Sequence, residues 1–220
     1  MRVASSADAL VVTIAGMPLW LSSSQDQTPQ QGNWKTYHTK SPIDMQQWRS
    51  AVKVGVTYFS QFGKPVYYEF WNEPDFSWFW SEDNQHYLDL YKETAEAIKE
   101  ADPSAKVGGS AINQWNHQLG GGTADLNTEL IRYAKQNGVP LDFVSWHFFS
   151  IYKNDLDQAV QRYQTELQGM STELMITEWN NPRDARNSEY AVISMAETFS
   201  YFYLLDLNKH AFSAFADFGF

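Results

Sequence analysis

The sequence predicts an α/β fold with a parallel sheet covered by helices. Short, nearly continuous apolar segments, typical of buried strands, alternate with longer segments of helical periodicity. No internal repeat, low-complexity tract or linker divides the chain, and 220 residues suit one domain. We therefore expect a single domain over residues 1–220, built from alternating strands and helices.

The predicted strands are rich in β-branched and aromatic residues. They are Leu10–Ala15, Val66–Trp71, Lys106–Ala111, Leu141–His147, Leu174–Glu178 and Ala211–Phe215. A closed (β/α)8 barrel needs eight strands and usually about 250 residues. Six parallel strands, with no helix before the first, therefore predict either a smaller open sheet or a TIM (β/α)8-type barrel lacking its first two β/α units.

The clearest predicted helix follows Trp80. Asp83 or Asn84 can cap its first turn, apolar residues then recur at three- and four-residue steps, and Asp102-Pro103 ends it. The other predicted helices are Pro42–Phe62, Leu126–Asn137, Leu156–Leu167 and Ser188–Leu207.

Composition excludes several classes of protein. The 16 basic and 26 acidic residues give a net charge of −10, which disfavours nucleic-acid binding. No stretch is long and apolar enough to cross a bilayer. The chain has no cysteine and its five histidines lack ligand spacing, so we expect no metal and no cofactor. Met1–Asp8 does not resemble a signal peptide, and extracellular, periplasmic and cytoplasmic locations all stay open, as does the oligomeric state.

Aromatic residues make up 16% of the chain, which is high for a core alone. The excess favours either large packed helices or a cleft lined with flat rings. Sugars have apolar faces and polar edges, so stacking on such rings is one physical use for them. Composition by itself leaves both interpretations open.

Two predicted strands end in a carboxylate. Val66–Trp71 continues into Asn72-Glu73-Pro74, where the proline stops the strand, and Leu174–Glu178 ends in the glutamate itself. Active sites of parallel α/β folds lie at the carboxyl edge of the sheet, so Glu73 and Glu178 should share one rim. A single glutamate at a strand end is more often a helix cap or an ion-pair partner; the Asn-Glu-Pro motif and the second glutamate favour a functional pair.

Two facing carboxylates in an aromatic cleft suit cleavage of a glycosidic bond. One protonates the leaving oxygen, while the other attacks the anomeric carbon or activates water. Mutual repulsion and unequal burial separate their proton affinities and so assign the roles. A separation of about 5–5.5 Å predicts retention of configuration, whereas about 9 Å predicts inversion.

At these segments the sequence resembles the retaining glycoside hydrolases built on (β/α)8 barrels, and within them family 39, the β-xylosidase and α-iduronidase group. The segments that carry the resemblance are Phe70-Trp71-Asn72-Glu73-Pro74-Asp75, Lys106-Val107-Gly108-Gly109-Ser110-Ala111, Val139-Pro140-Leu141-Asp142-Phe143-Val144-Ser145-Trp146-His147 and Ile176-Thr177-Glu178-Trp179-Asn180. They occur in the family's order and span most of the chain, so the set is specific where Asn-Glu-Pro alone is not.

The resemblance implies roles for individual residues. Glu73 matches the family's acid/base and Glu178 its nucleophile, while Asn72 matches the asparagine that binds the sugar 2-hydroxyl. His147 matches a histidine on the rim of the sixth strand, although a buried core histidine is the default interpretation without the resemblance. It also implies that the first strand seen here is the family's third, and that the partner is an oligo- or polysaccharide.

The sequence departs from the family pattern around the sugar. Trp146-His147-Phe148-Phe149 replaces Arg-His-Ala-Tyr, Trp179 replaces a tyrosine, and Phe215 is the nearest match to a tryptophan. These changes affect sugar contacts rather than the carboxylates, so a β-xyloside and a bacterial exopolysaccharide are both expected substrates. Trp179 and Trp20 are further candidate sugar contacts, with core packing the alternative for Trp20.

Two other function classes compete with hydrolysis. An opened barrel would expose strand edges, which favours a weakly active or inactive carbohydrate-binding or scaffold protein as the alternative. A serine hydrolase is disfavoured, because the sequence has no Gly-x-Ser-x-Gly segment.

Overall fold

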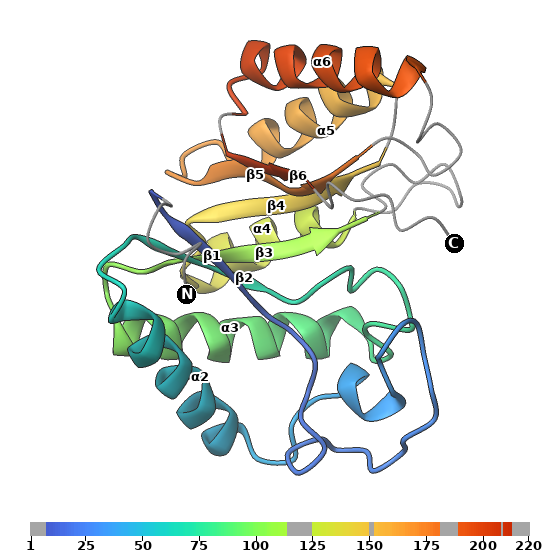
Figure 1. Cartoon of the computed structure of the whole chain (residues 1–220). Helices are drawn as coiled ribbons and strands as arrows, with labels where there is room; N and C mark the ends of the chain where they lie inside the picture. The colour runs from blue at the N-terminus through green and yellow to red at the C-terminus, as the bar shows by residue number, and fades with distance from the viewer. Residues whose placement is uncertain (1–7, 114–124, 150–151, 181–188, 208, 213–220) are drawn as a thin grey trace.

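The computed structural model describes residues 8–113, 125–149, 152–180, 189–207 and 209–212. Its strands form one parallel sheet in the order β1-β2-β3-β4-β5-β6, so each strand pairs with its neighbours in sequence (Figure 1). The strands are β1 (Leu10–Ile14), β2 (Val66–Phe70), β3 (Lys106–Ile112), β4 (Phe143–Phe148), β5 (Glu173–Trp179) and β6 (His210–Phe212). The parallel α/β prediction is confirmed, and the architecture is a partial α/β barrel.

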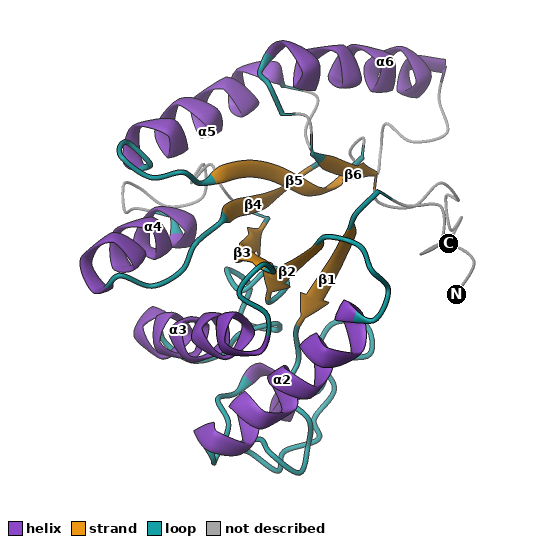
Figure 2. Cartoon of the chain, turned by 90° about the vertical axis from the view of Figure 1, so that its left-hand side faces the viewer, coloured by secondary structure: helices purple, strands orange, loops and turns teal. Residues whose placement is uncertain are grey.

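Helices cover one face of this sheet. Figure 2 shows the strands at the centre with α2 to α6 arranged in an arc around them. The helical elements are η1 (Thr36–Thr39), α2 (Met45–Ser60), α3 (Asn84–Ala101), α4 (Leu126–Asn137), α5 (Lys153–Glu166) and α6 (Glu189–Leu204). Within the described residues no helix is both long and apolar enough to cross a membrane.

Three helices begin at an aspartate whose side chain accepts backbone N–H bonds of the first turn. Asp44 caps α2, Asp83 caps α3 and Asp125 caps α4. Such a cap satisfies donors that the helix leaves unpaired and typically contributes about 1 kcal/mol. At the other end of α4, Gly138 adopts φ 64°, the left-handed conformation that glycine tolerates.

The two faces of the sheet carry different side chains, because successive residues of a strand point to opposite sides. On β2, Tyr68 and Phe70 belong to the large core that the helices cover. Tyr67 points to the inner side, where it clusters with Phe143 of β4 and Met175 of β5. By the same alternation the inner side of β4 continues from Phe143 through Ser145 to His147 towards the carboxyl edge.

Most predicted elements occur close to their predicted bounds, and α4 matches residue for residue. β4 starts at Phe143 rather than Leu141, because Asp142 interrupts the approach. Its carboxylate accepts the backbone N–H of Val107 and pairs with Lys99. The predicted strand Ala211–Phe215 overlaps β6, and its residues 213–215 lie outside the described part of the chain.

Gly108 of β3 lies at a close approach that no other residue fits. A Cβ atom added there would overlap the carbonyl oxygen of Phe143 on β4, whereas a Cβ on Gly55 of α2 would meet nothing within 4 Å. We expect Gly108→Ala to lower the free energy of unfolding by about 1–3 kcal/mol through overpacking. Gly55→Ala should instead raise it by about 0.5–1 kcal/mol through helix propensity. Urea denaturation of both variants checks this pair, and equal stabilities would contradict it.

Candidate active site

The carboxyl edge of the sheet gathers the two glutamates that the sequence singles out. Asn72 and Glu73 follow directly after β2, and Glu178 lies near the end of β5. His147 lies on β4, next to β5, and pairs in register with Glu178. Parallel pairing thus brings three strand ends that are distant in sequence to one rim.

Both carboxylates approach the same imidazole ring. Nδ1 of His147 hydrogen-bonds Oε1 of Glu73 at 2.8 Å. Nε2 of His147 lies 4.0 Å from Oε1 of Glu178. The two carboxylates therefore face opposite nitrogens of one ring, which links Glu73 and Glu178 across the edge of the sheet.

Asn113 also contacts Glu73. It follows β3 directly, and its Nδ2 donates to Oε1 of Glu73 at 2.6 Å, while its backbone N–H donates to Asp75. Oε1 of Glu73 thus takes bonds from two side chains. Within the described residues no hydrogen bond reaches the other oxygen, Oε2, which leaves that oxygen available for a ligand.

The two carboxylates differ in burial. The Glu73 side chain is 15% exposed and that of Glu178 is 41% exposed, whereas His147 is only 1% exposed. Glu73 therefore loses more hydration than Glu178 and depends more on its neighbours. This inequality is the kind that allows two like groups to take different roles.

The charge of His147 depends on these neighbours. Burial by itself lowers the pKa of His147, but the hydrogen bond to Glu73 and the negative charges of Glu178, Glu73 and Glu69 outweigh it, so the net pKa is raised. The imidazolium form is thus favoured inside the cluster of carboxylates.

The turn that carries Glu73 has an unusual backbone. Trp71 has φ 70° and Glu73 has φ 44°, in the left-handed region where non-glycine residues cost about 1 kcal/mol or more. Bonds on both sides hold the turn in place: the N–H of Trp71 donates to Ile14 and that of Glu73 to Ala111. The indole of Trp71 also donates to the carbonyl of Phe79 at 2.9 Å. The surrounding structure thus fixes where the Glu73 carboxylate points.

The other predicted site residues occupy different environments. Asn72 is half-buried beside Glu73, as its position in the motif requires. Trp20 lies in the segment after β1 and is 61% exposed. Trp179 is buried, with its ring against Phe199 and Phe202 of α6. The structure therefore brings Glu73, Glu178, His147 and Asn72 to one edge and places Trp179 in the core below the helices rather than facing a cleft.

An aromatic pair follows Glu73 on the same edge. Phe76 and Trp78 stack with ring centroids 4.5 Å apart and planes inclined by 13°, and Trp78 is partly exposed. Phe79 and Trp80 are buried instead, and the indole of Trp80 donates to the carbonyl of Asp83, which seats α3. Trp115 and His117, which the sequence places in the loop after β3, lie outside the described residues.

Two residues near the site were not singled out from the sequence. Asn113 is only weakly indicated by the sequence, because many polar residues follow the end of a strand. Glu69 is more strongly indicated: it is an acidic residue inside an otherwise apolar strand, four positions before Glu73. The structure buries Glu69 on the inner side of the sheet.

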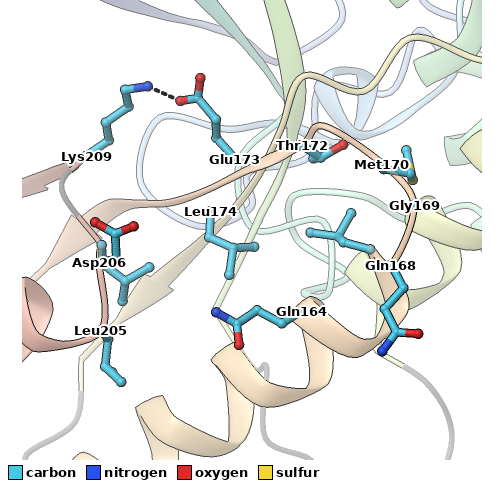
Figure 3. Close-up of a pocket in the computed structure, with 12 residues that line it drawn as sticks. Gln164, Gln168, Gly169, Met170, Thr172, Glu173, Leu174, Leu205, Asp206 and Lys209 are labelled. Atoms are coloured by element: carbon cyan, nitrogen blue, oxygen red, sulfur yellow. Dashed lines mark hydrogen bonds and ion pairs between the residues drawn. The ribbon is translucent and has the colours of Figure 1, made fainter.

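A groove of about 510 Å³ lies at the opposite end of the sheet. Figure 3 shows that the end of α5, the start of β5 and the segment before β6 surround it, and that Lys209 pairs with Glu173 there. This groove opens at the amino ends of the strands, where barrel residues usually serve stability rather than catalysis. Over the described ranges, no group of three or more His, Cys, Asp or Glu side chains is arranged to hold a metal ion.

Paired carboxylates at the carboxyl edge of a partial α/β barrel are typical of glycoside hydrolases. The family model described as "Glycosyl hydrolases family 39" matches residues 11–189. The chain therefore belongs to glycosyl hydrolase family 39.

Individual relatives agree with this assignment. The chain is 33% identical over 156 residues to a β-xylosidase of Geobacillus stearothermophilus, a match that covers 68% of this chain and 29% of that protein. It is 29% identical over 120 residues to an α-1,4-L-rhamnosidase of Formosa agariphila, covering 52% of this chain and 22% of that enzyme. A solved structure of a GH39 β-xylosidase from Caulobacter crescentus superposes with a TM-score of 0.70 at 25% identity, over 94% of this chain and 45% of that one. The chain thus spans less than a third of these curated relatives and under half of the solved chain.

The raised pKa of His147 predicts how stability depends on pH. A raised folded-state pKa contributes stability fully below the unfolded pKa of about 6.5 and loses it as pH rises through the folded pKa. We expect His147→Gln to cost about 1–3 kcal/mol of unfolding free energy near pH 6, because a charged hydrogen bond is lost. The cost should shrink towards pH 9.

Urea denaturation between pH 6 and pH 9 measures the difference in unfolding free energy between the wild-type protein and His147→Gln. His86→Gln is the matched control, because His86 also pairs with a carboxylate, that of Asp83, but lies exposed at the start of α3. A cost of His147→Gln that stayed constant or grew with pH would contradict the assignment of charge.

Proposed function

We propose that this chain carries the two catalytic carboxylates of a retaining glycosidase, with Glu178 as nucleophile and Glu73 as acid/base. The observation that carries the proposal is the approach of both carboxylates to the two nitrogens of His147 at the carboxyl edge of the sheet. Family 39 membership supports the reaction class.

In the first step, a carboxylate oxygen of Glu178 attacks the anomeric carbon and the glycosidic C–O bond breaks. Glu73 donates its proton to the departing oxygen, so the leaving group departs as an alcohol and a glycosyl ester of Glu178 remains. The greater exposure of Glu178 suits a group that must reach the sugar, and the available oxygen of Glu73 suits proton donation.

In the second step, Glu73 acts as base. It takes a proton from water, the water oxygen attacks the anomeric carbon, and the ester bond to Glu178 breaks to give the free sugar. Glu73 is a carboxylate at the start of this step, and His147 and Asn113 both hold its Oε1. Donors fixed in advance around a charge that appears during the reaction lower the barrier, because they need not reorganise.

The sugar would occupy the aromatic surface beside these carboxylates. We propose that Asn72 bonds the 2-hydroxyl, an interaction that strengthens in the transition state. The partly exposed ring of Trp78, backed by Phe76, and the exposed ring of Trp20 offer apolar faces for stacking. The name of one relative, β-xylosidase, supports a β-xyloside as substrate, and that of the other, α-1,4-L-rhamnosidase, supports a rhamnose-containing one. The bacterial exopolysaccharide expected from the sequence is the second candidate substrate.

We further propose that β1 to β6 correspond to the third to eighth strands of the family's (β/α)8 barrel. Nearest-neighbour parallel order is the order of such a barrel. A groove of about 280 Å³ runs between β1 and α2, lined by apolar side chains such as Val12, Val52 and Phe59. This apolar groove lies at the β1 edge of the sheet. It is the kind of surface against which a neighbouring β/α unit of a barrel would pack.

Kinetics on aryl xylosides tests the assigned roles. Glu73→Gln should lower kcat/KM, which reports the first step, about 10²–10⁴-fold when the leaving group is a poor one, and far less for dinitrophenolate, which needs no protonation. Glu178→Gln should abolish turnover of both, because no leaving group replaces the nucleophile. Glu173→Gln is the control, since it makes the same change at the far end of β5. Equal losses for Glu73→Gln on both substrates would contradict the acid/base assignment.

The same assay separates hydrolysis from the carbohydrate-binding alternative. That alternative predicts sugar binding without turnover, unchanged by either substitution at Glu73 or Glu178. The partial coverage of the relatives is the observation that keeps it in competition. Calorimetric titration with xylo-oligosaccharides measures binding independently of turnover.

Asn113 offers a second test of the geometry around Glu73. Asn113→Ala removes a 2.6 Å bond that holds Oε1, so Glu73 should be misplaced and kcat should fall about ten- to a hundredfold with little change in KM. Asn137→Ala, on the outer surface at the end of α4, should leave both constants unchanged. An effect of Asn113→Ala confined to KM would indicate a sugar contact instead.

A further inference from the structure

A buried carboxylate lies on the inner side of the sheet below the candidate site. Glu69 of β2 is only 3% exposed, and the residue opposite it on β1 is Thr13. Oγ1 of Thr13 donates to Oε2 of Glu69 at 3.1 Å. Oε1 of Glu69 is buried with no hydrogen-bond partner among the described residues. A carboxylate with one oxygen left unbonded is costly to bury.

The inner side of the sheet is layered, which places Glu69 relative to the site. The lowest layer is apolar and consists of Tyr67, Phe143 and Met175. Two residues further along the same strands, alternation brings Glu69, Ser145 and Thr177 to the next layer. The following step on β4 is His147, bonded to Glu73. Glu69 therefore occupies the layer between the apolar base and the imidazole.

The charges around Glu69 leave it one counter-ion. Among the described residues, no lysine or arginine contributes to the electrostatics of Glu69. The groups that face it on β1, β4 and β5 are the hydroxyls of Thr13, Ser145 and Thr177. Burial, and to a lesser extent the charge of Glu69, raise the pKa of Tyr87 on α3, so its hydroxyl is neutral. The remaining charged neighbour is His147, and the groups that face His147 are Glu73, Glu178 and Glu69.

We propose that Glu69 is a positioning residue of this site, a buried carboxyl whose charge adds to those of Glu73 and Glu178 in keeping the imidazole bonded to Glu73 protonated. Burial raises the pKa of Glu69, and the hydroxyl of Thr177 and then the positive charge of His147 oppose that shift. Each group thus stabilises the charged form of the other, and the two titrate as a coupled pair.

The proposed reaction explains why a third carboxyl is useful; this step rests on the function proposed above. Glu178 loses its charge when it becomes a glycosyl ester, and Glu73 alternates between acid and carboxylate. Glu69 is the one carboxyl facing His147 that the reaction leaves chemically unchanged. It can hold the imidazolium in place while the other two carboxyls change state.

Titration of the histidine rings by NMR tests the coupling without any need for turnover. In protein labelled with ¹⁵N-histidine, His147→Gln identifies the His147 signals among the five histidines. Glu69→Gln, which keeps the shape and removes the charge, should shift the His147 midpoint to lower pH, beyond the scatter of the other four rings. Glu173→Gln should leave that midpoint at its wild-type value. A folded Glu69→Gln protein with an unshifted His147 midpoint would overturn the proposal.

Two further measurements keep the proposal testable if Glu69→Gln does not fold. Thr13→Val keeps the carboxyl but removes its hydrogen bond, so it should shift the His147 midpoint in the same direction. In wild-type protein labelled at the glutamate side-chain carboxyl carbon, the Glu69 signal should change at the midpoint of His147. A Glu69 signal insensitive to that midpoint would overturn the coupling. Both results are independent of whether the chain hydrolyses glycosides, so failure of the proposed function would appear separately.

Discussion

The hydrogen bond between His147 and Glu73 is the contact on which the organisation of the site depends. It joins β4 to the turn after β2 across 74 residues of sequence, and the other nitrogen of the same ring faces Glu178 of β5. A buried imidazolium is stable only beside compensating negative charges, because an unpaired charge is costly to bury. Both glutamates face this ring, and the left-handed backbone and the bond from Asn113 hold the Glu73 carboxylate against it.

The sheet supplies the rigidity that such a site needs. Parallel pairing places the ends of β2, β4 and β5 at one edge, while the close approach of Gly108 to Phe143 brings β3 and β4 together. Aromatic packing of Trp71 against Trp80 and the capping of α3 by Asp83 fix the loop that follows Glu73. Side chains held by the scaffold on both sides lose little entropy when a ligand binds, which is the physical content of preorganisation.

Sequence reasoning reached the parallel sheet, the helix bounds and the shared edge of Glu73 and Glu178, because these follow from periodicity and from the geometry of parallel strands. It did not reach the environment of Trp179. Next to Glu178 in sequence, that ring could equally face a sugar or a helix, and only the packing of α6 decides. Asn113 escaped for a similar reason, since its partner lies on another strand. Glu69 was visible as an acid within an apolar strand, but its relation to His147 depends on which residues share a layer.

In the proposed mechanism, Glu178 attacks the anomeric carbon, while Glu73 donates and later accepts the proton. The most direct test is incubation with a 2-deoxy-2-fluoro-β-xyloside bearing a dinitrophenyl leaving group, followed by mass spectrometry of the peptides. A retaining mechanism with these roles predicts a fluoroxylosyl ester on Glu178 and its absence from Glu178→Gln. Turnover of an aryl xyloside with the label on another residue, or with no covalent label at all, would contradict the account.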